Sequence, residues 1–274
     1  MTLQPWICAT CGVEYPVAAE PPSHCPICED ERQYLGPKGQ QWTTPADLAR
    51  DHAVEWRDLE PGVSGVGVKP SFCIGQRALF IEHPQGGVLY DCVSMIDDAA
   101  VDEIGRRGGI AAIVPSHPHF YGAMVSWSER LGNVPVWVHE EDREWVVRPS
   151  SNVRFWSGET QTIVPGVTAI HIGGHFSGAQ VLHWTGKDGL GVIGAGDTIN
   201  VAQDTRWMSF MRSNPNYIPM SPSAVRNIQT MLAPFAFDRL YGSQWPKMVR
   251  SGAKDALARS VERYLTAIDA EVTA

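Results

Sequence analysis

The sequence predicts an α/β fold in which layered sheets carry helices on their outer faces. Short apolar segments bounded by turn residues alternate with amphipathic segments along most of the chain. Some consecutive apolar segments are joined by tight turns and are expected to pair as hairpins. Hairpins mixed with strand and helix alternation are typical of sheets packed against each other and against helices.

The individual elements follow from turn and capping residues. Residues 78–81 and 88–90 flank a turn with the sequence His-Pro-Gln-Gly-Gly, which predicts a hairpin. Asp97 is placed to cap the helix that follows it, and residues 110–114 form the next buried strand. The same patterns predict strands at 136–138, 167–170, 181–184 and 190–193. They also predict a helix over 45–50 capped by Thr43 or Thr44, a helix opened by Ser221 and Pro222 whose apolar face carries residues 225, 228 and 232, and a final helix near 252–268.

The first 42 residues differ in composition from the rest of the chain. They are poor in aliphatic residues and rich in Cys, Pro and Gly, so they cannot close a core of their own without a staple. We therefore expect a small N-terminal domain at residues 1–42 and a larger α/β domain at residues 43–274.

The N-terminal segment carries a metal-binding pattern. Cys8 and Cys11 form one closely spaced pair, and Cys25 and Cys28 form a second. Four thiolates in tetrahedral geometry suit zinc, or less often iron, and such a site is closed to chemistry. The pairs resemble the knuckles of rubredoxins and zinc ribbons, with a shorter gap than in a rubredoxin, which implies a structural zinc. Two disulfides are the alternative, disfavoured by the lack of a secretion signal.

Charge and hydropathy exclude some classes of partner. The net charge is −8 and the 22 Lys and Arg residues are scattered, so no nucleic-acid partner is expected. No apolar run approaches the ~20 residues that span a bilayer, and no signal peptide is recognisable, so we expect no membrane and a cytoplasmic location. A small molecule is the expected partner, and the sequence leaves open whether the chain forms a homo-oligomer.

Three histidines and one aspartate stand where strands end. His117 and His119 follow the strand at 110–114, and in an extended segment their side chains would point to the same side. His175 lies in a glycine-bounded turn, and Asp197 ends a later strand. A lone histidine is more often structural than a ligand, so order and spacing carry the argument here.

That order resembles the signature of the metallo-β-lactamase superfamily over roughly residues 70–250. The resemblance implies an αββα sandwich with His117, His119, His175 and Asp197 as metal ligands. The first motif of that family reads His-x-His-x-Asp-His. Here Tyr121 stands at its aspartate position and Gly122 at its final histidine, and no histidine occurs near residues 241–245. We therefore expect one ion, not two.

One zinc, iron or manganese ion with an open position could activate a water or polarise a carbonyl. By analogy with the family, the expected function is hydrolysis of an ester, thioester or lactone-like bond. Asp197 and Tyr121 are the expected catalytic residues, with Tyr121 a hydrogen-bond donor or acid. Two alternatives stay open: an iron-dependent oxygenase or a lyase or isomerase on the same site, and a degenerate binding protein without catalysis.

Other polar residues are expected to be structural. His171 is separated from His175 by two glycines, which argues against a shared helix face. Asp91 resembles a family aspartate that supports the metal loops. Residues 206–212 are rich in large apolar and guanidinium groups; they either cap a substrate pocket and receive an apolar or anionic substrate, or pack on the sheet or form a dimer contact. Structural roles are also expected for His83, His139 and His183.

Overall fold

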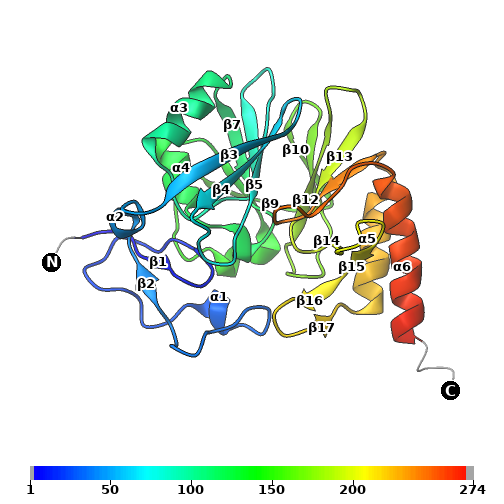
Figure 1. Cartoon of the computed structure of the whole chain (residues 1–274), viewed down its shortest axis with the longest axis horizontal. Coiled ribbons are helices and arrows are strands. Elements are labelled where there is room, and N and C mark those ends of the chain that lie inside the picture. Colours follow the sequence, from blue (N-terminus) through cyan, green and yellow to red (C-terminus); the bar gives the residue numbers. More distant parts are fainter. Residues whose placement is uncertain (1–2, 270–274) are drawn as a thin grey trace.

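Two sheets pack face to face, with helices on the outer side of each (Figure 1). The computed structural model describes residues 3–269. In this part of the chain one sheet has seven strands in the order β3-β4-β5-β6-β7-β8-β9. The other has six strands in the order β10-β11-β12-β13-β18-β19. This arrangement is the αββα sandwich that the sequence predicted.

The first sheet is antiparallel from β3 to β6 and parallel from β6 to β9. Its strands are β3 (Ala53–Glu60), β4 (Val63–Lys69), β5 (Ala78–Ile81), β6 (Gly87–Tyr90), β7 (Ile110–Val114), β8 (Val136–His139) and β9 (Val153–Trp156). The helical segments between them are α3 (Asp98–Arg106), η1 (Pro118–Phe120), α4 (Met124–Arg130) and η2 (Glu140–Trp145).

The second sheet is antiparallel except where β13 and β18 run parallel. Its strands are β10 (Thr160–Val164), β11 (Val167–His171), β12 (Gln180–Thr185), β13 (Gly191–Gly194), β18 (Arg239–Tyr241) and β19 (Met248–Val249). Helices α5 (Pro222–Leu232) and α6 (Ala253–Asp269) cover it. Short pairs form from β14 (Asn200–Val201) with β15 (Met208–Ser209) and from β16 (Met211–Ser213) with β17 (Ile218–Pro219).

Three apolar clusters hold these layers together. Residues of both sheets, among them Leu79, Tyr90 and Leu182, form the core between the sheets. A second cluster joins the outer face of the second sheet to α5 and α6. A third lies on the outer face of the first sheet and includes the N-terminal cysteines. The helix-covered face of each sheet therefore carries buried apolar side chains, as the interface between the sheets does.

The predicted elements are confirmed where local patterns were strong. The hairpin of β5 and β6 forms, and Asp97 caps α3 by accepting a hydrogen bond from the amide of Ala100 (2.8 Å). Thr44 caps the short helix α2 (Pro45–Leu48), and Ser221 caps α5.

Two long strands, β3 and β4, were not predicted. β4 carries Gly65 and Gly67, which weaken a strand pattern. The glycines are needed there because a Cβ on Gly65 would lie 2.5 Å from the ring of Trp245.

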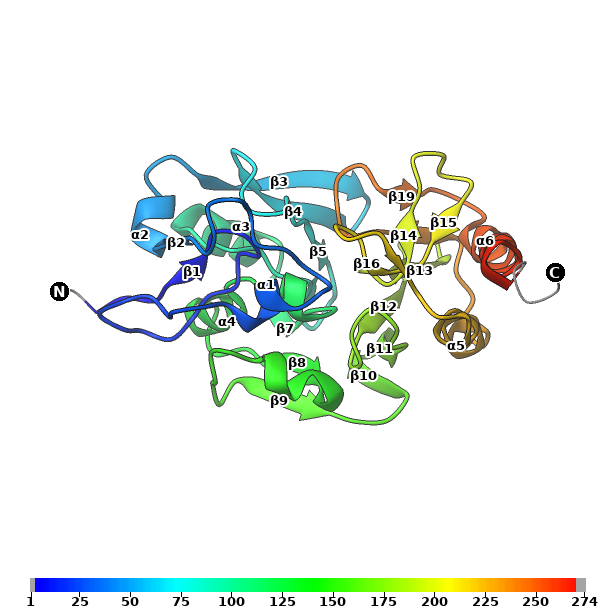
Figure 2. The same ribbon diagram turned by 90° about the horizontal axis from the view of Figure 1, so that it is seen from below.

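The cysteine-rich segment docks on the first sheet as an integral part of the fold. Its β1 (Ile7–Cys8) pairs with β2 (Trp42–Thr43), and the second cysteine pair lies at its α1 (Pro26–Glu29), with Cys25 just before the helix and Cys28 within it. We call residues 3–42 the ribbon. It runs along one edge of the sandwich and reaches the β16–β17 hairpin (Figures 1 and 2). Its cysteines share an apolar cluster with the first sheet, so the ribbon and the larger domain pack together without a gap. The domain boundary near residue 42 stays a prediction.

The segment 206–212 mostly packs on the sheet. Met208 and Phe210 are buried in the cluster under α5 and α6, whereas Arg206 is exposed and pairs with Asp204. No helix within the described range 3–269 has the length and apolar character needed to cross a membrane.

Candidate metal centre

The four predicted ligands of the larger domain come together where strands end. His117 follows β7, His119 lies in η1, His175 follows β11 and Asp197 follows β13. One ligand atom from each lies within 4.8 Å of those of the others. We call this group the histidine site. The carboxyl ends of strands from both sheets, each followed by a loop, bring residues far apart in sequence to one edge of the sandwich.

The local geometry of the first two ligands differs from the prediction. His117 is extended, with φ −171° and ψ 172°, but residues Pro118–Phe120 form a 3₁₀ turn. The amide of Phe120 donates to the carbonyl of His117 (2.9 Å). The expected extended segment is therefore wrong beyond His117, because Pro118 starts a turn readily with its fixed φ. The two imidazoles still converge, with ring centroids 5.1 Å apart.

The ligand atoms are spaced as one ion requires. Nε2 of His175 lies 3.3 Å from Nδ1 of His119, and Nε2 of His117 lies 3.6 Å from Oδ2 of Asp197. Metal bonds of about 2.0–2.1 Å in a tetrahedron place ligand atoms about 3.3–3.4 Å apart. Nε2 of His117 is buried and has no hydrogen-bond partner among residues 3–269. A buried nitrogen without a partner is costly unless something binds it, so these residues fit a metal ion.

Hydrogen bonds fix the remaining atoms of the ligands. Oγ of Ser116 lies 2.8 Å from Nδ1 of His117, and the carbonyl of Met211 lies 3.1 Å from Nδ1 of His175. The hydroxyl of Ser243 donates to Oδ1 of Asp197. His117, His175 and Asp197 are therefore each held by one atom and leave the other free for the ion, as is usual at metal sites.

Burial sets the charge state of the site. It lowers the pKa of His119 well below its usual range and lowers the pKa of His175 to about 3. Burial alone would raise the pKa of Asp197, but the nearby imidazole of His117 and the hydrogen bond from Ser243 hold that pKa below its usual range. Neutral imidazoles and an ionised carboxylate are the forms that coordinate a metal.

The buried carboxyl of Asp91 supports the first metal loop. Its Oδ1 accepts a hydrogen bond from the amide of Ser116 (2.7 Å), and burial raises its pKa to about 7. Asp91 itself has a positive φ of 67°, an uncommon backbone conformation for a residue other than glycine. This contact agrees with the supporting role suggested by the sequence.

The ribbon and neighbouring backbone enclose Gly122, which stands at the position of the family motif's final histidine. The carbonyl of Gly122 accepts a hydrogen bond from the amide of Glu14 in the ribbon (3.0 Å). A Cβ on Gly122 would lie 2.7 Å from the carbonyl oxygen of Val93, and φ of Gly122 is +47°. Ser243 stands in the segment where the family's late histidine was expected. No side chain beyond glycine fits at residue 122 without moving the backbone.

Tyr121 is not among the described residues that line the cavity over the histidine site. It is buried in the core shared with the ribbon, and its hydroxyl has no hydrogen-bond partner in the described part of the chain. Burial raises the pKa of its hydroxyl, and the charge of Asp142 adds to the shift. The catalytic role expected for Tyr121 stays a prediction.

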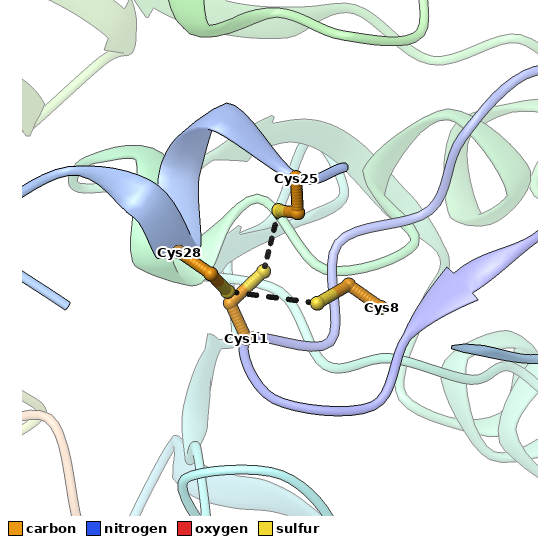
Figure 3. A group of neighbouring side chains, drawn as sticks. All are labelled: Cys8, Cys11, Cys25 and Cys28. Atoms are coloured by element: carbon orange, nitrogen blue, oxygen red, sulfur yellow. Dashed lines mark hydrogen bonds between the residues drawn. The ribbon is translucent and has the colours of Figure 1, made fainter. Parts of the chain in front are cut away.

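The four cysteines of the ribbon face one another (Figure 3). Sγ of Cys8 lies 3.5 Å from Sγ of Cys28, and Sγ of Cys11 lies 3.8 Å from Sγ of Cys25. Zinc–sulfur bonds of about 2.3 Å in a tetrahedron place sulfurs about 3.8 Å apart. All four thiols are free, so the disulfide alternative is not observed. We call this group the cysteine site, and its spacing fits one structural ion.

One side chain bridges the two sites. Nε2 of Gln76 donates to the carbonyl of Cys11 (2.6 Å) and to the carbonyl of His119 (3.1 Å). A second contact joins the ribbon to the histidine site, because Nη1 of Arg32 lies 3.5 Å from the carbonyl of His175. The sequence analysis missed both residues. Arg32 follows the last ribbon cysteine by four positions, but no local pattern predicts its distant partner.

A cavity of about 460 Å³ opens over the histidine site. This volume suits a small molecule. Its floor includes His119, His175 and Asp197, and its walls include ribbon residues 32–34 and the late segment 242–244. The ribbon therefore forms one wall of the candidate substrate site.

Four other histidines contact backbone oxygens outside this cavity. His139 and His171 stack with ring centroids 3.7 Å apart, and with Glu141 they form a further group of close ligand atoms. Nε2 of His171 lies 2.7 Å from the carbonyl of Ser177, and Nε2 of His139 lies 3.3 Å from that of Gly158. His83 and His183 likewise lie near backbone carbonyls. These contacts agree with the structural roles expected.

The sequence has a relative of similar length. It is 43% identical over 270 residues to the uncharacterized protein YmaE of Bacillus subtilis, and the match covers 97% of this chain and 98% of YmaE. No protein-family model matches the sequence.

Solved structures resemble the fold at low sequence identity. A metallo-β-lactamase of Cronobacter sakazakii with a HARLDQ motif matches with a TM-score of 0.52 and 18% identity, covering 82% of this chain and 96% of that chain. VMB-1 matches with a TM-score of 0.58 and 13% identity, covering 78% and 98%. The metallo-β-lactamase FIM-1 of Pseudomonas aeruginosa in its mono-zinc form matches with a TM-score of 0.54 and 15% identity, covering 77% and 95%. These matches show the fold.

The cysteine site predicts a defined loss of metal. Replacing Cys8 and Cys11 by serine should remove one metal equivalent per chain, because two of the four thiolates are lost. Mass spectrometry of the metal content measures this. The control is Cys73→Ser, a cysteine outside the ligand group, which should keep its full metal content. Unchanged metal in the double variant would refute the assignment.

The Gln76 bridge predicts coupling between the ribbon and the histidine site. Gln76→Leu should weaken zinc binding at the histidine site by about 10–100-fold, since it removes the donor that fixes the backbone of His119. Competition with a zinc-binding dye measures the affinity. Gln85→Leu, in an exposed turn, is the matched control. Equal affinity in both variants would show that the bridge does not position the ligand.

Gly122 predicts that the family motif cannot be restored by one substitution. Gly122→His should recruit no second ion and should lower the free energy of unfolding by about 1–3 kcal/mol from backbone strain, plus a clash with the backbone of Cys92 and Val93. Gly132→His, which has a positive φ but open space around it, isolates the strain. Denaturant unfolding and metal content are measured together. A stable Gly122→His variant that binds an extra ion would contradict this geometry.

Proposed function

Because the chain belongs to the same family as YmaE of Bacillus subtilis and has the metallo-β-lactamase fold, we propose that it is a metal-dependent hydrolase. In this proposal one ion at the histidine site serves the reaction, and a zinc ion at the cysteine site serves only the structure. The proposed substrate is a small molecule with an ester, thioester or lactone-like bond. Zinc is the proposed ion of the histidine site, with iron or manganese as alternatives.

One observation carries this proposal. The unpartnered Nε2 of His117 converges with the ligand atoms of His119, His175 and Asp197, and these three residues line a cavity of about 460 Å³. A purely structural cluster would be expected to satisfy its own buried nitrogens, as His139 and His171 do with backbone carbonyls.

The residues of the site have separable roles. A divalent ion held there would lower the pKa of a bound water towards neutrality and polarise a substrate carbonyl. His117, His119 and His175 hold their ligand nitrogens in place, and Asp197 presents Oδ2 beside His117. The hydroxyl of Ser243 occupies Oδ1 of Asp197, so Oδ2 is left for the ion.

The type of bond follows from what the site lacks. Tyr121 stands in place of the aspartate that would help to position water in the family motif. Its side chain is not among the described residues that line the cavity over the histidine site. With one ion and no such aspartate, the site suits bonds with good leaving groups. Oxygen and sulfur leave esters, thioesters and lactones with less need for proton transfer than the nitrogen of an amide.

The proposal predicts activity that depends on metal and on Asp197. Purified protein is stripped of the metal at the histidine site, reloaded with zinc, iron or manganese, and assayed with 4-nitrophenyl esters, an acyl thioester and a lactone. We expect zinc to restore hydrolysis, and Asp197→Ala to lower kcat/KM by about 100-fold or more. His83→Gln, in a turn outside the cavity, is the matched control.

Two results would contradict simple hydrolysis. Iron retained selectively at the histidine site, with products formed only in the presence of oxygen, would indicate an oxygenase. Metal bound by the cysteine site but never by the histidine site would indicate a binding protein without catalysis.

A further inference from the structure

The cavity over the histidine site has a charge opposite to that of the chain. The chain carries a net charge of −8. Arg32 and Lys247 nevertheless line the cavity, and the one carboxylate among its described lining residues is the ligand Asp197. Lys247 has no ion pair with any residue of the described range, and a bound divalent ion would add further positive charge. Such a concave site concentrates anions.

The guanidinium of Arg32 is held in a fixed position. Its Nε lies 2.5 Å from Oδ1 of Asp30, and its Nη2 lies 2.8 Å from Oδ2 of the same carboxylate. Its central carbon lies 3.8 Å from the ring centre of Phe176. The side chain is 9% exposed, so little conformational entropy remains to be lost when a ligand binds.

Part of this guanidinium is left for a ligand. Of its five N–H donors, two face Asp30 and one faces the carbonyl of His175. Two N–H groups therefore have no partner in the described part of the chain, while the residue lines the cavity. Because the carboxylate of Asp30 already balances much of the positive charge of the guanidinium, Arg32 suits a monoanionic ligand better than a phosphate dianion.

The ribbon segment that carries Arg32 is clamped against the second half of the fold. Nδ2 of Asn216 donates to the carbonyls of Glu31 (2.8 Å) and Gln33 (2.9 Å). Nε of Arg212 lies 2.6 Å from a carboxylate oxygen of Glu31. These contacts from β16 and the turn before β17 fix the position of Arg32 relative to the histidine site.

We propose that Arg32, supplied by the ribbon, binds a carboxylate of the substrate, and that Lys247 adds a second positive charge to the same end of the cavity. This inference rests on the proposed function and narrows it to small carboxylate-bearing esters, thioesters or lactones. The bond to be cleaved lies over the histidine site, and the carboxylate lies at the ribbon wall. The ribbon is then a specificity element as well as a staple.

Calorimetry with a matched ligand pair tests the subsite without turnover. Glutarate and its monoamide, glutaramate, are titrated into the zinc-loaded full chain, with succinate and adipate pairs to vary the length. Each ligand offers a carboxylate to the ion, but only the diacid offers a second one to Arg32. We expect glutarate, or the diacid of best length, to bind about 10-fold or more tightly than its monoamide, the gain typical of charged hydrogen bonds.

Variants identify the residues responsible. Arg32→Gln should reduce the preference for the diacid to about 2-fold or less, and Lys247→Gln should reduce it in part. Lys247 contacts no metal ligand in the described residues, so it decides the outcome if Arg32→Gln also loses metal or stability. Arg206→Gln, whose side chain is 80% exposed and outside the cavity lining, is the control and should keep the full preference.

The outcomes separate this inference from the proposed function. Equal binding of every diacid and its monoamide, or a preference that survives both Arg32→Gln and Lys247→Gln, would overturn the carboxylate subsite even if hydrolysis is observed. An Arg32-dependent preference in a protein that hydrolyses none of the assayed bonds would uphold the subsite and overturn only the hydrolase.

Discussion

The side-chain amide of Gln76 is the contact on which both candidate metal sites depend. It donates at once to the carbonyl of Cys11 in the ribbon and to the carbonyl of His119 in the histidine site. A buried carbonyl that loses its donor costs free energy. A shift of either loop away from Gln76 would therefore be unfavourable. The ribbon, whose small core needs a staple, and the metal loop, whose ligands need orientation, therefore stabilise each other through one residue.

The ribbon contacts the larger domain at two places beside the histidine site. Its Glu14 donates its amide to the carbonyl of Gly122, where the backbone of Cys92 and Val93 closes over the space in which a side chain would begin. The ribbon also places Arg32 on the wall of the cavity. The contact at Gly122 and the charged wall are thus two consequences of the docked ribbon.

Local patterns in the sequence were enough to predict layered sheets with outer helices, the capped helices and the cysteine group, because each depends on residues close in sequence, such as Asp97 before α3 or the paired cysteines. The αββα sandwich and the histidine group were predicted from the order of motifs that resembles the metallo-β-lactamase superfamily. The roles of Gln76, Arg32 and Ser243 could not be predicted, because their partners lie 65, 143 and 46 positions away. The 3₁₀ turn at His119 was also missed, since Pro118 permits both an extended and a turn conformation.

Anomalous X-ray diffraction from crystals of the metal-loaded protein tests the central claim most directly, because it locates each ion separately. The account predicts two ions per chain, one among the four ribbon sulfurs and one bound by His117, His119, His175 and Asp197. A further ion beside Asp197, about 3.5–4 Å from the first, would contradict it by showing a dinuclear centre despite the docked ribbon. So would a histidine site that stays empty while the cysteine site is filled.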